Sequence, residues 1–355
     1  MVEGATPSAN FVHRQYQLEK RMTIDWEPLG KIINDHQRFV LTSHVRPDAD
    51  ALGSEIGMAR ILVALGKQVK IVNQSPTPPR LGFIDTEGWI CQLGKSATAE
   101  EALDTDVHII LDTSAWGQLQ DMGKILGKTD AVKVVIDHHV SSDDLGAIVF
   151  KNTTAAATGE MVYELAVALG YTVDAIAATA LYCAIVTDTG WFRFPSSTVN
   201  TMRVGAALME LGANPAALYE QLYEQYSLAR MRLAGRSLQR ITPEFDGLLT
   251  HTYIRWDDYA ETGAVPPDTE DLVNECMRIA GAQAAFILIE QSNRQVKCSF
   301  RSRVGINVAA VAEQFGGGGH QQAAGTILPG PISDARQKVL AALRPVMEQV
   351  KKAGG

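Results

Sequence analysis

The segment VIDHH, residues 135–139, places an acid, Asp137, directly before two neighbouring histidines, His138 and His139. The chain contains only eight histidines, and these two follow an apolar run that is typical of a buried β-strand. Three interpretations are open at this point: a chance cluster, a pair that stabilises a turn, and a metal site. The other acids and histidines of the chain decide among them.

Acids and histidines follow other apolar segments in the same way. The segment RFVLTSH runs into VRPDAD, the segment VHIIL into Asp112, and the segment LYCAIVT into Asp188. In open parallel sheets, ligands bind beyond the carboxyl ends of the strands, where such side chains meet. The residues expected at this edge are His44, Asp48, Asp50, Asp112, Asp137, His138, His139 and Asp188.

A single acid at a strand end is most often a cap for the next helix, and Asp50 before ALGSEIG fits this simpler interpretation. The whole group is harder to explain in that way. Several carboxylates confined together carry uncompensated negative charge unless cations lie among them. Asp48 and Asp50, at i and i+2 in an extended loop, are expected to point to the same side. The group therefore favours a metal site.

The ligand types limit the choice of metal. Imidazole and carboxylate without thiolate suit Mn²⁺, Mg²⁺, Fe²⁺, Co²⁺ or Zn²⁺, and the excess of carboxylates favours the harder ions. Even six ligating side chains from this group of eight are too many for one ion that must also hold substrate and water. Two ions that share a carboxylate fit better. A pair about 3.5–4 Å apart is the usual arrangement for in-line displacement at phosphorus, where it activates water and stabilises the leaving oxygen.

A run of four glycines in FGGGGHQQAAG, residues 315–325, is the second feature that could do chemistry. A flexible linker is the simpler interpretation, but a helical stretch precedes the run and an apolar segment follows it. Glycines let backbone N–H groups approach an anion, so the run also fits a phosphate cradle. Arg301 and Arg303 lie near the end of a predicted strand, and one of the two guanidinium groups is expected to face the same ligand.

The elements that must position these residues alternate between strand and helix, which predicts an α/β fold with a parallel sheet covered by helices on both faces. A smaller α/β domain is expected after Pro243, behind an almost wholly helical stretch at 198–240. The expected parts are an N-terminal extension (1–30), a catalytic domain (31–225), a helical connector (226–240) and a second domain (241–355). Strands are expected at 38–44, 67–73, 106–112, 131–137, 146–150, 248–256, 284–291 and 295–302, and helices at 51–66, 158–169, 174–186, 269–280, 306–314 and 332–350.

Composition limits the classes of partner. The formal net charge is −8, which argues against a broad basic surface for long nucleic acid but allows a small anionic ligand held by metals and a few cations. No apolar window reaches the roughly 18 residues of a membrane span, and the N-terminus lacks the apolar region of a signal peptide. Four scattered cysteines suit buried free thiols. We expect a cytoplasmic protein with no membrane partner.

Five short motifs together resemble the DHH phosphoesterase family with its associated C-terminal domain: HVRPDADALGS (44–54), LDTS (111–114), DHH (137–139), VTDTG (186–190) and GGGGH (316–320). The resemblance spans about residues 38–330. Each motif alone is modest evidence, but five in the family's order are specific. The resemblance is strongest to stand-alone, two-domain oligoribonucleases that degrade very short RNA. Many of these also remove the 3′-phosphate of adenosine 3′,5′-bisphosphate (pAp).

The resemblance implies a role for each candidate residue. One Mn²⁺ is expected on His44, Asp48 and Asp112, and a second on Asp50, Asp112, His138 and Asp188, so that Asp112 bridges the two ions; Mg²⁺ or Co²⁺ are possible substitutes. His139 is expected to face the scissile phosphate, and Asp137 to orient its neighbours. The residues expected to grip the substrate's terminal phosphate and nucleotide are Arg301, Gly317, Gly318, Gly319 and His320.

The function implied is that of a manganese-dependent phosphoesterase, an oligoribonuclease and 3′(2′),5′-bisphosphate nucleotidase. It hydrolyses very short RNA to mononucleotides and pAp to AMP. Three alternatives stay open: cleavage of pApA or cyclic dinucleotides, inorganic pyrophosphatase or polyphosphatase activity, and a non-catalytic nucleotide-binding regulator. The resemblance is also compatible with a homodimer.

Overall fold

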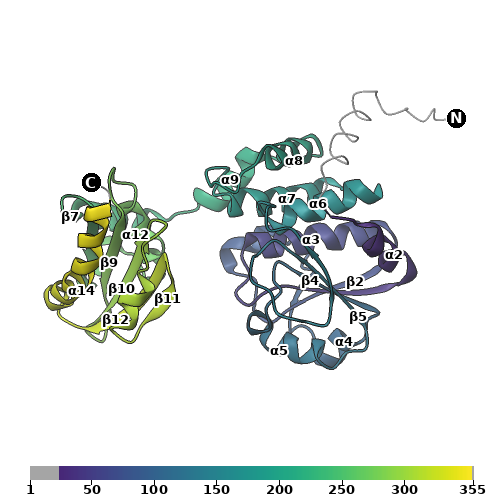
Figure 1. Ribbon diagram of the computed structural model, residues 1–355, viewed down its shortest axis with the longest axis horizontal. Helices are drawn as coiled ribbons and strands as arrows, with labels where there is room; N and C mark the ends of the chain where they lie inside the picture. Colours follow the sequence, from purple (N-terminus) through teal and green to yellow (C-terminus); the bar gives the residue numbers. More distant parts are fainter. Residues whose placement is uncertain (1–23, 354–355) are drawn as a thin grey trace. The chain divides into compact units, whose positions relative to one another are not determined.

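The computed structural model describes residues 24–353, and the chain divides into two compact units between Glu224 and Gln225 (Figure 1). The first unit holds a six-stranded parallel sheet and the second a six-stranded mixed sheet. The predicted α/β architecture is therefore confirmed. Of the extension expected over 1–30, residues 1–23 lie outside the described residues, and Trp26 and Leu29 are buried in the core of the first unit.

The strand order of the first sheet determines where a ligand can bind. Its strands are β1 (Arg38–Thr42), β2 (Gln68–Asn73), β3 (Ile90–Gln92), β4 (Val107–Leu111), β5 (Val132–Asp137) and β6 (Ile148–Lys151). They lie in the order β3-β2-β1-β4-β5-β6, and all neighbouring pairs are parallel. The chain leaves β1 toward one edge of the sheet and later crosses to β4 on the other side. In such a sheet, the ends of β1 and β4 flank the crevice where ligands bind.

Helices cover both faces of this sheet (Figure 1). On one side lie α3, α6 and α7, whose apolar residues form the large core with β1, β4 and β5; on the other lie α4 and α5. The helices are α2 (Glu27–Asp35), α3 (Ala49–Ala64), α4 (Ala99–Leu103), α5 (Trp116–Leu126), α6 (Thr158–Leu169), α7 (Ala175–Asp188), α8 (Val199–Glu210) and α9 (Pro215–Tyr223), with the 3₁₀ helix η1 (Pro79–Ile84) after β2.

Two glycines allow three of these helices to pack closely. A Cβ atom at Gly53 of α3 would collide with the carbonyl oxygen of Ala180 on α7, and one at Gly159 of α6 would lie 2.6 Å from the Cβ of Ala184. A side chain at either position would separate the helices. The close packing brings the first turns of α3 and α6 and the last turn of α7 to the same edge of the sheet.

The start of α3 differs from the prediction. The helix begins at Ala49, and Asp48 is its N-cap, since Asp48 Oδ1 accepts hydrogen bonds from the backbone N–H groups of Asp50 and Ala51 at 3.0 and 3.1 Å. The interpretation of Asp50 as the cap was therefore wrong, and so was the extended loop expected across Asp48 and Asp50. Asp50 lies in the first turn of α3 and is buried.

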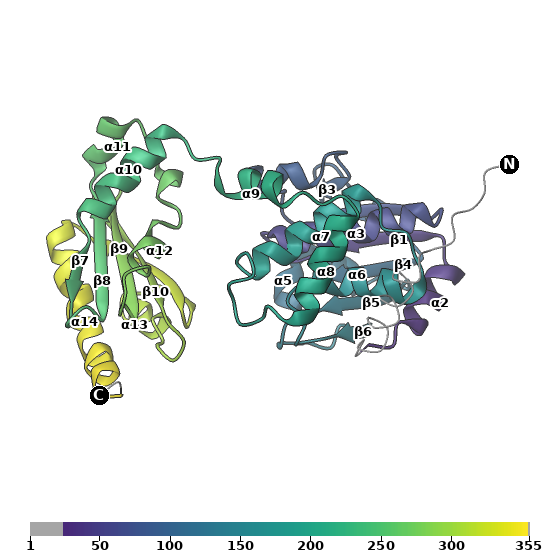
Figure 2. The same ribbon diagram turned by 90° about the horizontal axis from the view of Figure 1, so that it is seen from above.

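The second unit contains a sheet in the order β11-β12-β10-β9-β8-β7, in which only β8 and β9 pair in parallel (Figure 2). Its strands are β7 (Thr242–Glu244), β8 (Leu249–Ile254), β9 (Ala284–Glu290), β10 (Gln295–Ser302), β11 (Gly318–His320) and β12 (Ala323–Pro329). Its helices are α10 (Leu228–Gln239), α11 (Trp256–Thr262), α12 (Leu272–Cys276), α13 (Ala309–Glu313) and α14 (Ile332–Ala353), with the 3₁₀ helix η2 (Pro266–Thr269). The helix predicted over 269–280 is reduced to α12.

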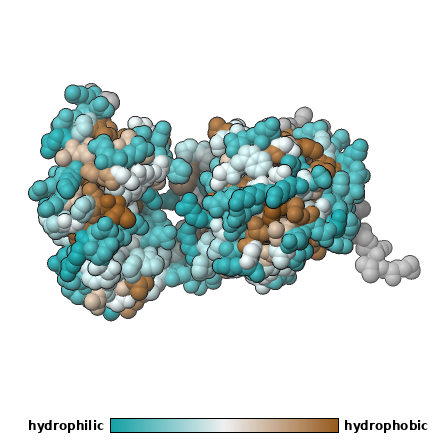
Figure 3. Space-filling model, turned by 90° about the horizontal axis from the view of Figure 1, so that it is seen from below, coloured by the Kyte–Doolittle hydropathy of each residue, from teal (hydrophilic) through white to brown (hydrophobic). Residues whose placement is uncertain are grey.

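The predicted surface properties can be compared with the described residues. Among residues 24–353, no helix combines the length and the apolar character that a membrane crossing needs. On the face seen in Figure 3, hydrophobic residues gather in patches among hydrophilic ones. All four cysteines are free; Cys183, Cys276 and Cys298 are buried, whereas Cys91 is partly exposed.

His108, in the middle of β4, leads to a prediction about acid stability. Its side chain is fully buried, and neither ring nitrogen has a hydrogen-bond partner among the described residues. Burial, together with the charge of Lys133, lowers the pKa of His108 from 6.5 to about 4. The unfolded chain therefore takes up a proton below about pH 6.5 that the folded chain resists, so stability is lost as the pH falls from there toward 4.

We expect His108→Leu to remove this loss, which is on the order of 3 kcal/mol near pH 4. Urea unfolding of both proteins at neutral pH and near pH 4.5 measures it. His36→Leu, at a half-buried histidine that follows α2, serves as the control, and it should keep the wild-type pH dependence. If His108→Leu and wild type lose the same unfolding free energy on acidification, the explanation is wrong.

Candidate active site

The first group of ligands lies at the end of β1. His44, Asp48 and Asp112 each offer one ligand atom, and these atoms lie within 4.8 Å of one another. His44 Nε2 is 3.3 Å from Asp112 Oδ2 and 3.9 Å from Asp48 Oδ1. The other ring nitrogen, Nδ1, is 3.0 Å from the carbonyl oxygen of Val45. A hydrogen bond from Nδ1–H to this carbonyl leaves Nε2 as the free electron-pair donor, which is the usual arrangement for a metal-binding histidine.

The second group comes from three other elements. Asp50 of α3, His138 after β5 and Asp188 at the end of α7 again place their ligand atoms within 4.8 Å of one another. His138 Nε2 is 3.6 Å from Asp50 Oδ2 and 3.5 Å from both Asp188 Oδ2 and Asp112 Oδ1. Its Nδ1 is 3.3 Å from the carbonyl oxygen of Ala155. In both histidines, Nδ1 lies near a backbone carbonyl oxygen, and this orients the ring so that Nε2 faces carboxylates.

Asp112 lies between the two groups. Its Oδ2 faces His44 and its Oδ1 faces His138, so each carboxylate oxygen belongs to a different group. The residue is only 2% exposed and has a φ of +62°, a left-handed conformation that is unfavourable for a residue with a side chain. Its backbone N–H donates to the carbonyl oxygen of Ile136, which continues the β4–β5 pairing to the site.

The carboxylates repel one another in this buried setting. Burial, and then the charges of Asp50 and Asp48, raises the pKa of Asp112 well above its usual value. The same causes raise the pKa of Asp188 to about 7. Cations between the groups would remove this repulsion. Imidazole nitrogens and carboxylate oxygens without a thiolate are ligands suited to Mn²⁺ or Mg²⁺, so the residues present fit a pair of divalent cations.

Residues of α6 and α3 to which the sequence analysis gave no role hold these ligands in place. The backbone N–H groups of Thr158 and Gly159 donate to the two oxygens of Asp50 at 2.8 and 2.9 Å, and Ser54 Oγ donates to Asp50 Oδ1 at 3.1 Å. Thr158 Oγ1 also donates to Asp112 Oδ1 at 2.9 Å. The start of a helix favours a carboxylate in this way. The only sequence signal was a Thr-Gly pair at the beginning of an apolar helix.

Asp137 and His139 form a separate pair beside the metal ligands. Asp137 is fully buried, and its Oδ1 is 2.8 Å from His139 Nδ1 and accepts the His139 backbone N–H at 3.1 Å. Burial raises the pKa of Asp137, but hydrogen bonds from His139, Ser114 and Lys151 outweigh this and leave the pKa low. The bond to Asp137 also raises the pKa of His139, whose side chain is 49% exposed. The pair leaves Nε2 of His139 available to a substrate.

The geometry allows His139 a second role. His139 Nδ1 is 3.7 Å from Asp112 Oδ1, and His139, His138 and Asp112 also satisfy the 4.8 Å criterion for ligand atoms. Distances alone therefore do not separate a histidine that binds metal from one that faces phosphate. The bond from Nδ1 to Asp137, which occupies the nitrogen nearest Asp112, favours a histidine that faces phosphate.

The expected phosphate-gripping residues lie on the second sheet. Arg301 of β10 and His320 of β11 both pair with Ala323 of β12 in register, so their side chains project from the same face of the sheet. The guanidinium of Arg301 donates from Nε to Asn274 Oδ1 at 3.1 Å and from Nη1 to the carbonyl oxygen of Phe300 at 3.0 Å. The structure therefore brings Arg301 and His320 to a common face.

Arg301 lies within β10, whereas Arg303 follows the end of this strand. Arg303 donates from Nη2 to the carbonyl oxygen of Met277 at 3.1 Å, and its backbone N–H donates to the carbonyl oxygen of Gln283 at 2.8 Å. These bonds tie the end of β10 to the turn after α12. Arg303 therefore has a structural role at the end of β10.

The glycine run is not a linker, because part of it forms the edge strand β11. A Cβ atom at Gly317 would collide with the carbonyl oxygen of Gly325, and one at Gly319 would lie 2.5 Å from the carbonyl oxygen of Ala323. Close approach to β12 therefore explains the need for glycine at these two positions. A Cβ atom at Gly318 meets nothing within 4 Å, so this position is open to a ligand.

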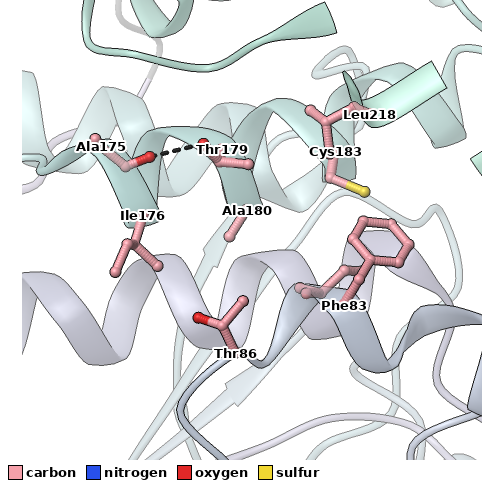
Figure 4. Close-up of a pocket in the computed structure, with 9 residues that line it drawn as sticks. Phe83, Thr86, Ala175, Ile176, Thr179, Ala180, Cys183 and Leu218 are labelled. Atoms are coloured by element: carbon pink, nitrogen blue, oxygen red, sulfur yellow. Dashed lines mark hydrogen bonds between the residues drawn. The ribbon is translucent and has the colours of Figure 1, made fainter. Parts of the chain in front are cut away.

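An apolar hollow of about 250 Å³ lies between η1, α7 and α9 (Figure 4). Phe83 and Ile176 line it, with Cys183 at the side nearer the end of α7, and none of the candidate ligands does. Burial raises the pKa of Cys183 to about 12, so its thiol stays protonated and is a poor nucleophile. The hollow therefore offers no chemistry of its own.

The chain matches two family models. Residues 38–186 match the DHH family, N-terminal domain, and residues 251–349 match the DHHA1 domain. Each match falls within one of the two units of the structure.

Similar proteins match over most of their length. The bifunctional oligoribonuclease and PAP phosphatase NrnA of Thermus thermophilus is 32% identical over 88% of this chain and 90% of its own. The protein of the same description from Bacillus subtilis is 28% identical over 84% and 91%. Among solved structures, an exopolyphosphatase-related protein from Bacteroides fragilis is 25% identical, with a TM-score of 0.83 over 92% of this chain and 97% of its own. This chain therefore belongs to the DHH family, with a DHHA1 domain in its second unit.

Proposed function

We propose that the protein is a two-metal phosphoesterase that hydrolyses very short oligoribonucleotides to mononucleotides and pAp to AMP. The observation that carries this proposal is the position of Asp112 between two groups of metal-ligand type, with one oxygen directed at each. Relatives described as bifunctional oligoribonuclease and PAP phosphatase, matched over 90% and 91% of their own lengths, support the substrate class.

His44, Asp48 and Asp112 would hold one divalent cation, and Asp50, Asp112, His138 and Asp188 the other. When bound, such a pair lowers the pKa of a water molecule and offsets the charge that develops on phosphate oxygens. We propose Mn²⁺ as the ion, with Mg²⁺ or Co²⁺ as substitutes, because all six side chains offer hard or borderline donors.

The remaining side chains act on the substrate itself. His139, held through Nδ1 by Asp137, presents Nε2–H to the scissile phosphate or to the leaving oxygen. Its raised pKa, caused first by the bond to Asp137, favours the protonated ring that such a donor needs. Asp137 keeps the ring orientation constant, because its other oxygen is held by Ser114 and Lys151. Arg301 and His320 bind the terminal phosphate.

Turnover of a 5′-labelled RNA dinucleotide with added Mn²⁺ tests the proposal, with pAp, pyrophosphate and pApA in parallel. Release of mononucleotides from the dinucleotide and of AMP from pAp, with pyrophosphate untouched, is the expected result. Hydrolysis of pyrophosphate alone would contradict it and place the protein among pyrophosphatases. Bound Mn²⁺ without turnover of any phosphoester would leave the nucleotide-binding regulator as the better description.

Arg301 is expected to contribute to binding rather than to bond cleavage. Arg301→Met removes charge-assisted hydrogen bonds worth roughly 1.5–3 kcal/mol, so KM for the dinucleotide should rise about 10- to 100-fold with a much smaller change in kcat. Steady-state kinetics measure both constants. Arg294→Met, at an exposed arginine in the turn before β10, is the control and should behave like wild type. An unchanged KM for Arg301→Met would remove Arg301 from the substrate site.

A further inference from the structure

Lys151, the last residue of β6, uses all the hydrogen-bonding capacity of its ammonium group beside the candidate active site. Its Nζ is 3.1 Å from Asp137 Oδ2, 2.8 Å from Ser114 Oγ and 2.6 Å from the carbonyl oxygen of Ser141. An ammonium group has three N–H donors, and here each has its own acceptor. The side chain is only 17% exposed, so little of this interaction is lost to water.

The three acceptors belong to three different segments of the chain. Asp137 ends β5, Ser114 lies in the loop between β4 and α5, and Ser141 lies in the loop that follows the two histidines. Ser114 Oγ itself lies 2.6 Å from Asp137 Oδ2 and 2.9 Å from the carbonyl oxygen of Ser141. The three acceptors are therefore grouped around Lys151 Nζ. Lys151 pairs in register with Asp137 across the β5–β6 ladder, which places Nζ there.

The charge of Lys151 balances a buried carboxylate. Asp137 is fully buried, and its Oδ1 is occupied by His139, whose ring nitrogen and backbone N–H both lie close to it. Removing one partner of a buried ion pair leaves an uncompensated charge and is strongly destabilising. Among the described residues, Lys151 is the one lysine or arginine with an ion pair to Asp137.

The loop of residues 138–143, which carries both histidines, has further hydrogen bonds to the same centre. The backbone N–H of Asp143 donates to the carbonyl oxygen of Ser114 at 2.7 Å, and that of His139 to Asp137 Oδ1 at 3.1 Å. The loop is therefore held at both its beginning and its end. Lys151 binds between these two points, through Ser141.

We propose that Lys151 is a positioning residue that holds the Asp137–His139 pair and the loop of residues 138–143 in the geometry for catalysis. The expected effect on kcat rests on the proposed function, whereas the expected effect on the loop does not. The partners of the Lys151 ammonium group are Asp137, Ser114 and Ser141, and none of these three is a proposed metal ligand. Its effect therefore passes through Asp137 and the loop, and it should alter kcat rather than KM.

The test compares Lys151→Met with wild type by two measurements on the full chain. Hydrogen–deuterium exchange of peptides that cover 138–143 should become at least about tenfold faster, because the amides of His139 and Asp143 lose protection. The value of kcat for the dinucleotide should fall roughly 10- to 100-fold, the usual cost of losing a group that orients an active residue, with KM changed less than about twofold. Lys151→Arg, which keeps the charge, should recover part of kcat.

Lys133→Met is the matched control, since Lys133 is a partly buried lysine of β5 whose Nζ donates to the carbonyl oxygen of Leu126 at 3.4 Å, away from Asp137 and Ser141 in the hydrogen-bond network. It should keep wild-type kcat and wild-type exchange in 138–143. Ser114→Ala is a second, milder variant for the case that Lys151→Met fails to fold, and the same two changes are expected at smaller size.

The outcomes separate this inference from the proposed function. Unchanged exchange and unchanged kcat in Lys151→Met would overturn the inference while an active wild type upholds the function. Faster exchange with wild-type kcat would also overturn it, because the loop would then be held for stability alone. An inactive wild type with faster exchange in Lys151→Met would support the tether to the loop and refute the function.

Discussion

Asp112→Asn is expected to reduce turnover of the RNA dinucleotide by roughly a thousandfold or more. The substitution keeps the size of the side chain but removes the charge that both ligand groups share. Metal ions contribute several kcal/mol to stabilisation of a phosphoryl transition state, and each 1.4 kcal/mol corresponds to about a factor of ten in rate. Mn²⁺ titration by calorimetry should show weakened binding at both positions, because Asp112 directs one oxygen at each group.

The same substitution should stabilise the metal-free protein. Asp112 is 2% exposed and lies among other carboxylates, so removing its charge relieves repulsion that the fold otherwise bears. Asp174→Asn is the control, because Asp174 caps the start of α7, at the opposite end of this helix from Asp188, and pairs with Arg60. The control should retain wild-type turnover. Full activity of Asp112→Asn, or loss of metal at one position only, would show that Asp112 does not bridge.

His139→Gln is expected to reduce kcat by roughly 100- to 10,000-fold while both metal ions stay bound. General acid catalysis by a positioned side chain has an effect of this size, and glutamine cannot transfer a proton at neutral pH. The six proposed metal ligands are untouched by the change. Steady-state kinetics and the metal content after dialysis measure the two parts of this prediction.

The metal content decides between the two roles that the distances allow for His139. Loss of one ion in His139→Gln would identify His139 as a ligand, in line with its 3.7 Å distance from Asp112 Oδ1, and would contradict the phosphate role. His36→Gln is the matched control, because the ring of His36 lies 2.8 Å from the carbonyl oxygen of Ile32 in α2, and His36 is not a candidate site residue. It should change neither kcat nor metal content. Together, Asp112→Asn and His139→Gln separate metal binding from action on the substrate.

Much of the parallel sheet could be predicted from the sequence, because its strands are buried on both faces and appear as continuous apolar runs. The runs that end in Asp112 and Asp137 correspond to β4 and β5 within a residue or two. The short strands β3, β7 and β11 and the longer strand β12 were not predicted. Strands of three residues contain too few side chains for a period to show, and β11 is defined only by its pairing with β12.

The residues that support the site could not be predicted in the same way. Thr158, Ser114 and Lys151 hold Asp50, Asp112 and Asp137 through hydrogen bonds across wide separations in the chain. Ser114 ends the LDTS motif, but neither period nor motif reveals the supporting role of these residues, because that role depends on which segment lies opposite. Asp48 shows the same limit: a cap and a ligand have the same sequence signal, and Asp48 caps α3 while it lies in the first ligand group.

The sequence by itself determined the fold class, most of the parallel sheet and the set of acids and histidines that follow the strands. These depend on local hydrophobic pattern and on the rule that parallel strands bring their carboxyl ends to one edge. Only the tertiary structure decided that Asp112 directs its two oxygens at different groups, that His138 faces carboxylates while His139 is held by Asp137, and that Lys151 closes the network behind them. The physical reason is that a hydrogen bond or an ion pair between remote segments is made or lost when the distance between its atoms changes by a few tenths of an ångström. The packing of the helices and strands sets those distances.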